Sequence, residues 1–168
     1  MKKESVTAKL ALLGMTVAAA MIFSYAESFI SFGVPGLKVG LPNIVTVFLI
    51  YRIGWKEAAA VSFVRCVLTA VLFGSVMSLA YSMAGAALSI TIMAILKRWD
   101  KFSCVGVSIA GGITHNAGQI AVAIAVTGTE EIAYYMPVLA IGGTLAGLVI
   151  GVAGGLVLKK LKNTKVGM

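Results

Sequence analysis

The residues of this chain that could do chemistry are few, and most of them lie inside apolar stretches. The 168 residues include six acids and one histidine. A single histidine cannot form a metal site, and the acids are scattered, with only Glu130 and Glu131 adjacent. Magnesium-dependent phosphate chemistry needs several carboxylates close together. The sequence therefore predicts no metal site and no cofactor, and we expect that the chain is not an enzyme.

The most prominent polar cluster is His115, Asn116 and Gln119, which interrupts a long apolar run. Polar side chains inside a membrane are costly, and they often mark a functional site. Two interpretations stay open for these three residues. They could form a hydrogen-bonded clamp between helices, or they could supply directional hydrogen bonds to a ligand. A proton relay between His115 and Glu27 has no support in the spacing.

Arg65 is the one basic residue that lies deep inside an apolar stretch. It follows Glu57 by eight residues, which places it about 12 Å along a helix. One interpretation pairs Arg65 with Glu27 as a structural ion pair between helices. The other has Arg65 facing an anionic ligand, with Glu27 pairing with it only when the site is empty, or contacting a cationic group of the ligand.

A third candidate region lies between the first two apolar stretches, where Lys38 and Asn43 occur in a run rich in glycine and proline. Pro42 suits the first turn of a helix. The N-terminus of that helix would expose free N–H groups, which favour anions. We expect Lys38 to neutralise ligand charge; the alternative is that it lies in solvent at the membrane surface.

These residues must be positioned by helices that cross a membrane. The chain is 60% hydrophobic and 12% charged, about half the charge of a soluble domain. The expected fold is a single all-α integral membrane domain, residues 1–168. Its six spans cover about residues 8–29, 41–53, 57–73, 76–96, 103–126 and 134–158. The second span is about 20 Å long, less than the hydrocarbon core of about 30 Å. Either loop residues extend it, or its outer end is sunken in the membrane.

The basic residues predict the orientation. Of the 14 Lys and Arg, all but Lys38 and Arg65 fall on one side of the six spans. Because such a bias marks the cytoplasmic side, both termini are expected there, in a multi-pass protein of the cytoplasmic membrane. The net charge of +8 therefore indicates anchoring at the lipid bilayer and not binding of nucleic acid.

Small residues predict close helix packing. Gly143, Gly147 and Gly151, followed by Gly155, recur every four residues in the last span, and Gly14 and Ala18 form a shorter pattern in the first. Such faces allow helices to approach closely. They suit either packing within the bundle or docking to another membrane subunit.

Several of these runs resemble a known family. The runs Gly36–Val45, Gly54–Ala58, Val64–Arg65, Tyr81–Gly85 and Leu96–Arg98 resemble substrate-binding (S) components of energy-coupling-factor (ECF) vitamin transporters. More narrowly, His115–Gln119 and Tyr134–Val138 are similar to the Gx transporter family, whose members also carry the label heptaprenyl diphosphate synthase component I. The resemblance extends from about Pro35 to the C-terminus.

The resemblance implies a six-helix S-component-like fold. In such proteins the ligand binds near the outer side, under the loop between the first two helices, here residues 31–40. Small residues of the first helices, here Gly14 and Ala18, meet a transmembrane coupling subunit that recruits cytoplasmic ATPases. The synthase label conflicts with the residues, because the chain has no aspartate-rich motif.

The function expected from the sequence is a membrane subunit that binds or transports a small anionic or polar molecule. Two other classes stay open. One is an accessory subunit of polyprenyl diphosphate or quinone biosynthesis, and the other is a membrane component of flavin- or quinone-linked extracellular electron transfer.

Overall fold

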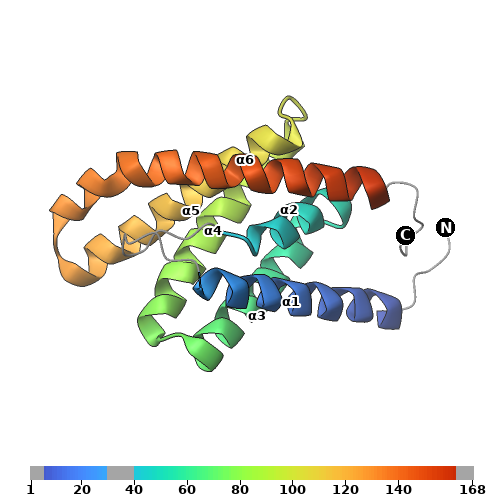
Figure 1. Ribbon diagram of the computed structural model, residues 1–168, viewed down its shortest axis with the longest axis horizontal. Coiled ribbons are helices and arrows are strands. Elements are labelled where there is room, and N and C mark those ends of the chain that lie inside the picture. The colour runs from blue at the N-terminus through green and yellow to red at the C-terminus, as the bar shows by residue number, and fades with distance from the viewer. Residues whose placement is uncertain (1–5, 30–39, 162–168) are drawn as a thin grey trace.

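The computed structural model describes residues 6–29 and 40–161. Lys38 and most of the loop expected over residues 31–40 lie outside the described residues. The described part of the chain is all-α, as expected, and from Asn43 onward its helices are joined by short turns (Figure 1). The helices are α1 (Val6–Ser28), α2 (Asn43–Arg52), α3 (Trp55–Phe73), α4 (Val76–Arg98), α5 (Cys104–Thr127), the short 3₁₀ helix η1 (Glu130–Tyr135) and α6 (Met136–Leu161).

Four of the helical segments are long and apolar enough to cross a membrane: Val6–Glu27, Val76–Arg98, Cys104–Thr127 and Glu130–Lys160. Helix α2 is too short at 10 residues. Helix α3 is long enough at 19 residues, but it carries Lys56, Glu57 and Arg65. The chain is therefore a membrane-embedded helical protein. Helix α2 is too short, and α3 too charged, to meet the same criterion of length and composition.

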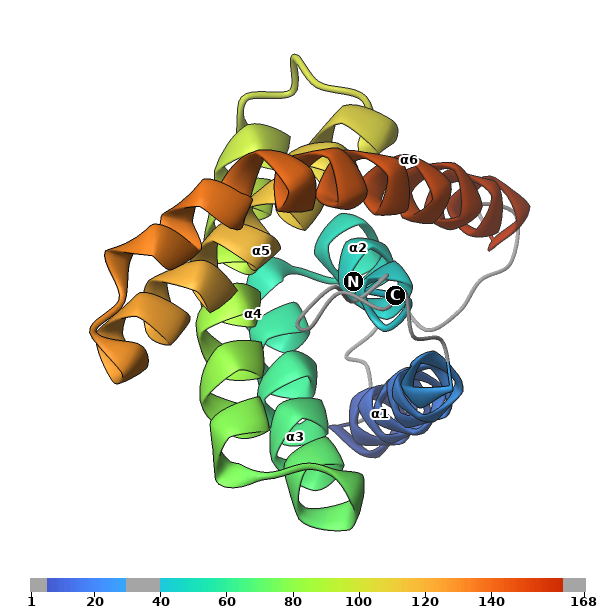
Figure 2. The same ribbon diagram turned by 60° about the vertical axis from the view of Figure 1, so that its left-hand side comes forward.

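The helices are arranged around α2 (Figure 2). Helix α5 packs along both α4 and α6, and α3 connects this group to α1. Helix α2 contacts α6 and α3 and supplies fully buried side chains to the core, among them Val47, Leu49 and Ile50. The shortest α-helix is therefore enclosed by the longer ones.

Local sequence explains where several helices begin and end. The hydroxyl of Ser75 accepts a hydrogen bond from Ser78 N at 3.1 Å, and that of Ser103 accepts one from Gly106 N at 3.1 Å. These are N-caps, which satisfy N–H groups that have no partner within the helix. Helix α5 ends at Gly128, whose φ of 67° is the left-handed conformation common at helix ends.

The glycines of α6 pack against α5. A Cβ added to Gly147 or Gly151 would lie 2.6 or 2.7 Å from an α5 Cα atom. At the crossing point, a Cβ on Gly112 would lie 2.3 Å from the carbonyl oxygen of Gly143. Gly155 has open space around it. Gly143, Gly147 and Gly151 thus form a seam inside the molecule.

Gly14 and Ala18 have a different environment on α1. Both are exposed, and a Cβ added to Gly14 would meet nothing within 4 Å. In the apolar segment of α1, only 11% of the residues are buried inside the molecule. The small residues of the first helix therefore lie on an open surface, not in a helix crossing within the described chain.

Candidate binding site

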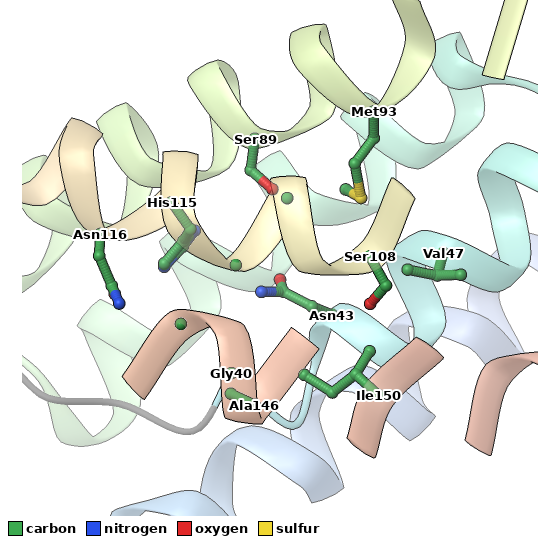
Figure 3. Close-up of a pocket in the computed structure, with 13 residues that line it drawn as sticks. Gly40, Asn43, Val47, Ser89, Met93, Ser108, His115, Asn116, Ala146 and Ile150 are labelled. Carbon is green, nitrogen blue, oxygen red and sulfur yellow. The ribbon is translucent and has the colours of Figure 1, made fainter. Parts of the chain in front are cut away.

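A small buried cavity lies where α2 begins. Its volume is about 10 Å³, the room that one water molecule needs. Figure 3 shows side chains from α2, α4, α5 and α6 around it. The lining residues are Gly40, Asn43, Val47, Ser89, Met93, Ser108, Gly111, Gly112, His115, Asn116, Gly143, Ala146 and Ile150.

The position of α2 explains why the cavity lies deep in the bundle. Asn43, the first residue of α2, lines the cavity together with Ser108 from the first half of α5 (Figure 3).

The polar residues of α5 contact two neighbouring helices, α6 and α4. The amide of Asn116, 2% exposed, donates to the Leu139 carbonyl of α6 at 2.8 Å. The amide nitrogen of Gln119 lies 3.2 Å from Nε2 of His115. His115 fits against α4 only because Gly85 has no side chain: a Cβ there would lie 2.9 Å from the ring.

Ser89 is a site residue that the sequence did not single out as a ligand contact. It is 1% exposed, and within the described chain its hydroxyl has no hydrogen-bond partner. The hydroxyl points toward the cavity (Figure 3). A buried hydroxyl without a partner costs about 1–3 kcal/mol, so the cavity offers an unused hydrogen bond. The only sequence signal was its place in the serine-rich face of α4.

The start of α2 differs from expectation. The helix begins at Asn43, just after Pro42, and its first N–H groups are occupied. The N–H groups of Asn43, Ile44 and Val45 each donate to the carbonyl three residues earlier, at 2.8, 3.1 and 3.1 Å. The N–H of Gly40 donates to the carboxylate of Glu27. An anion of the chain itself therefore lies at this helix end, where we expected free N–H groups for a ligand.

Arg65 lies in a second polar seam, between α1 and α3. It is 8% exposed, and its guanidinium donates to the Ser24 hydroxyl at 3.4 Å and to the Cys66 sulfur at 3.3 Å. Both of these partners are neutral groups. Arg65 does not line the cavity.

The structure thus separates the residues that sequence reasoning grouped together. Asn43, His115 and Asn116 line one cavity, Gln119 contacts it through His115, and Glu27 holds its Gly40 wall. In the described ranges, 6–29 and 40–161, no group of three His, Cys, Asp or Glu side chains could hold a metal ion. The arrangement suits hydrogen bonding to a small polar group.

The fold and the site define a membrane-embedded helical protein with a buried polar cavity. The model of the heptaprenyl diphosphate synthase component I family matches residues 16–157, so the chain belongs to that family. A search of curated proteins found no match. A search of solved structures found none either.

Proposed function

We propose that this chain is a membrane subunit that binds a small polar or anionic molecule for transport, in the manner of an ECF S component. The observation that supports this is the cavity at the start of α2. It gathers Asn43, Ser89, Ser108, His115 and Asn116 from three helices whose other contacts are mostly apolar. A concave site with a few convergent polar groups is typical of small-molecule recognition.

We propose that all six helices lie in the cytoplasmic membrane, with both termini in the cytoplasm. The basic residues at the ends of α2, α4 and α6 support this orientation. The opposite ends of the helices, where α1 leads to α2, then face outward. The ligand would enter the cavity from that side.

A cavity of about 10 Å³ holds water and not a larger molecule, so binding requires one wall to move. The walls from α4, α5 and α6 are held by backbone contact, at Gly118 against Ala84 and at Gly112 against Gly143. The beginning of α2 is held by the Glu27–Gly40 hydrogen bond and by side chains. The wall that moves in this proposal is therefore the Gly40–Asn43 end of α2.

The transport proposal includes a partner. The chain would supply recognition, while a transmembrane coupling subunit with cytoplasmic ATPases supplies energy. The open Gly14–Ala18 face of α1 supports such a docking surface. We propose no enzymatic activity for the chain alone.

The family name favours a second candidate function. A protein called component I of a heptaprenyl diphosphate synthase would work with another component. In that role, the helical bundle would present a lipid substrate to a soluble synthase whose carboxylates hold magnesium. Co-purification with such a synthase would support this candidate over transport.

Native mass spectrometry of the detergent-purified protein, with fragmentation of any bound molecule, tests the proposal. We expect a small polar molecule that is lost in Asn43→Ala, because Asn43 lines the cavity and its side chain has no hydrogen bond among the described residues. The matched control is Thr114→Val. Thr114 lies on the same helix as His115, but its hydroxyl bonds to its own helix at 2.7 Å and is not in the cavity wall.

The melting temperature of both variants should stay unchanged, which separates binding from folding. A wild-type protein that binds no small polar molecule would contradict the proposal. So would a molecule that Asn43→Ala retains as well as Thr114→Val does.

A further inference from the structure

A shallow groove runs along the face of α4 that points away from the core. At one end it lies between α4 and α5, with a volume of about 520 Å³. At the other end it lies beside the α2–α3 connection, with a volume of about 620 Å³. Thr91 lines both parts. Helix α4 packs against both α3 and α5 (Figure 2).

The α4 residues of the groove follow helical spacing and are small or apolar over most of its length. They are Ala84, Ala87, Leu88, Thr91, Ala94, Ile95 and Arg98. From Ala84 to Arg98 the helix rises about 21 Å, more than one leaflet of a hydrocarbon core about 30 Å thick. The Thr91 hydroxyl donates to Ala87 O at 2.8 Å, so it offers no free donor along the groove.

The last turn of α4 gives one end of the groove a positive charge. Arg98 is exposed, and Lys97 lies beside it in the same wall. The ammonium of Lys97 donates to the Ile50 carbonyl and lies 5.4 Å from the ring centre of Tyr51. An ammonium has three donors, and within the described chain one is used. Trp55, which is 55% exposed, forms the opposite wall.

We propose that this groove binds one anionic phospholipid. The headgroup lies between Lys97, Arg98 and Trp55, and the apolar chain lies along α4 toward Ala84. The charge decides the occupant, because basic pockets at the end of membrane helices bind anionic headgroups. A transmembrane helix of a partner would cover the apolar part but leave both cations unpaired. This site is separate from the cavity at the start of α2 and does not depend on the transport proposal.

The two tryptophans make the site directly measurable. The chain contains only Trp55 and Trp99, so Trp99→Phe leaves Trp55 as the single fluorescent reporter in the groove. This protein would be titrated in detergent with phosphatidylglycerol carrying brominated chains, which quench tryptophan on contact. Brominated phosphatidylcholine, whose headgroup is neutral overall, is the comparison. We expect the anionic lipid to quench Trp55 at a several-fold lower mole fraction.

Two pairs of variants locate the binding. Arg98→Gln should weaken the quenching by phosphatidylglycerol about fivefold, whereas Lys160→Gln, an equal change of charge in the last turn of α6, should not. Ala94→Phe fills the groove and should reduce quenching by both lipids. Its control is Ala60→Phe on the exposed face of α3, outside both parts of the groove.

A phosphate headgroup on an apolar chain could belong to a bulk phospholipid or to an isoprenoid diphosphate. Unlabelled geranylgeranyl diphosphate added to the quenched complex separates them. If it restores fluorescence at a lower mole fraction than unlabelled phosphatidylglycerol does, the occupant is the diphosphate. If phosphatidylglycerol competes as well or better, it is the phospholipid.

Displacement by the diphosphate at the lower mole fraction would overturn the proposal. Equal quenching by the two brominated lipids would overturn it, and so would Arg98→Gln binding phosphatidylglycerol as well as Lys160→Gln does. If Arg98→Gln does not accumulate, the comparison of Ala94→Phe with Ala60→Phe still tests the proposal, because both variants keep Lys97 and Arg98. Equal quenching in these two variants would then overturn it.

Discussion

Arg65 is the residue whose burial most needs an explanation. Its hydrogen bond to Ser24 is long at 3.4 Å, and long hydrogen bonds are weak. Its other partner, the Cys66 sulfur at 3.3 Å, is a weak acceptor. Neither partner is charged. A buried guanidinium with weak neutral partners keeps most of its capacity to bind an anion.

Arg65 does not line the cavity at the start of α2. We therefore expect Arg65→Ala to abolish binding of an anionic ligand in the seam between α1 and α3 and to leave a folded protein. Loss of the contact to Ser24 should cost about 0.6 kcal/mol, a typical value for hydrogen bonds between membrane helices. The control is Ser24→Ala, which removes the contact and keeps the charge. Ligand binding followed by native mass spectrometry, together with thermal melting, checks both variants. If Arg65→Ala does not accumulate or melts far lower, Arg65 is a structural charge.

The sequence predicted part of the site because charged and amide side chains are rare in apolar stretches. His115 and Asn116 were found in this way, and both line the cavity. Ser89 was not assigned a role, because serine is a common small residue on a membrane helix and one hydroxyl has no distinctive spacing. The Glu27–Gly40 contact depends on how the chain returns between α1 and α2, which local patterns do not specify.

At the scale of the helices, the seam between α5 and α6 is the tightest crossing. Gly112→Ala would place a methyl group 2.3 Å from the carbonyl oxygen of Gly143, so the helices must separate. We expect a loss of about 2 kcal/mol in the free energy of unfolding. Gly155→Ala is the control, since nothing lies within 4 Å of its added Cβ, and it should be neutral or slightly stabilising. Unfolding in dodecyl sulfate measures both, and equal losses would mean that the seam is looser than described.

For the open face of α1, we predict that larger side chains leave stability unchanged but affect binding of a partner. Gly14→Leu and Ala18→Leu add volume where both residues are exposed, so the melting temperature of the isolated protein should not change. If this face docks to a coupling subunit, the variants should lose co-purification with it. Ala60→Leu on α3 is the control and should retain it. Unchanged recovery of the partner in all three variants would exclude this face as the docking surface.

Helix boundaries were more predictable than helix partners. The ends expected from apolar runs agree with all six helices to within about three residues, because charged and capping residues mark them. The glycines of α6 indicated a close approach but not the helix that makes it. That partner depends on Gly112, a single residue whose pairing is visible only in three dimensions.

For the whole molecule, the distribution of basic residues predicts that both termini face the cytoplasm. Cysteine labelling with a membrane-impermeant maleimide tests this, in a background where Cys66 and Cys104 are replaced by alanine. Thr129→Cys, between α5 and η1, should react in intact cells. Lys101→Cys, between α4 and α5, should react only after the membrane is opened. The reverse pattern would invert the topology, and labelling of both on one side would exclude a full span by α5.

The enclosure of α2 has a consequence for how the protein is made. A growing chain leaves the ribosome from its N-terminus, so α2 emerges long before α6, one of the two helices it packs against most. Until α6 arrives, the Asn43 end of a 10-residue helix faces lipid or water with its polar groups uncovered. The newly made protein therefore passes through a stage in which α1, α2 and α3 have been synthesised but α2 has not yet packed against α6. A chain truncated before α6 would remain at that stage and would be a substrate for membrane proteases.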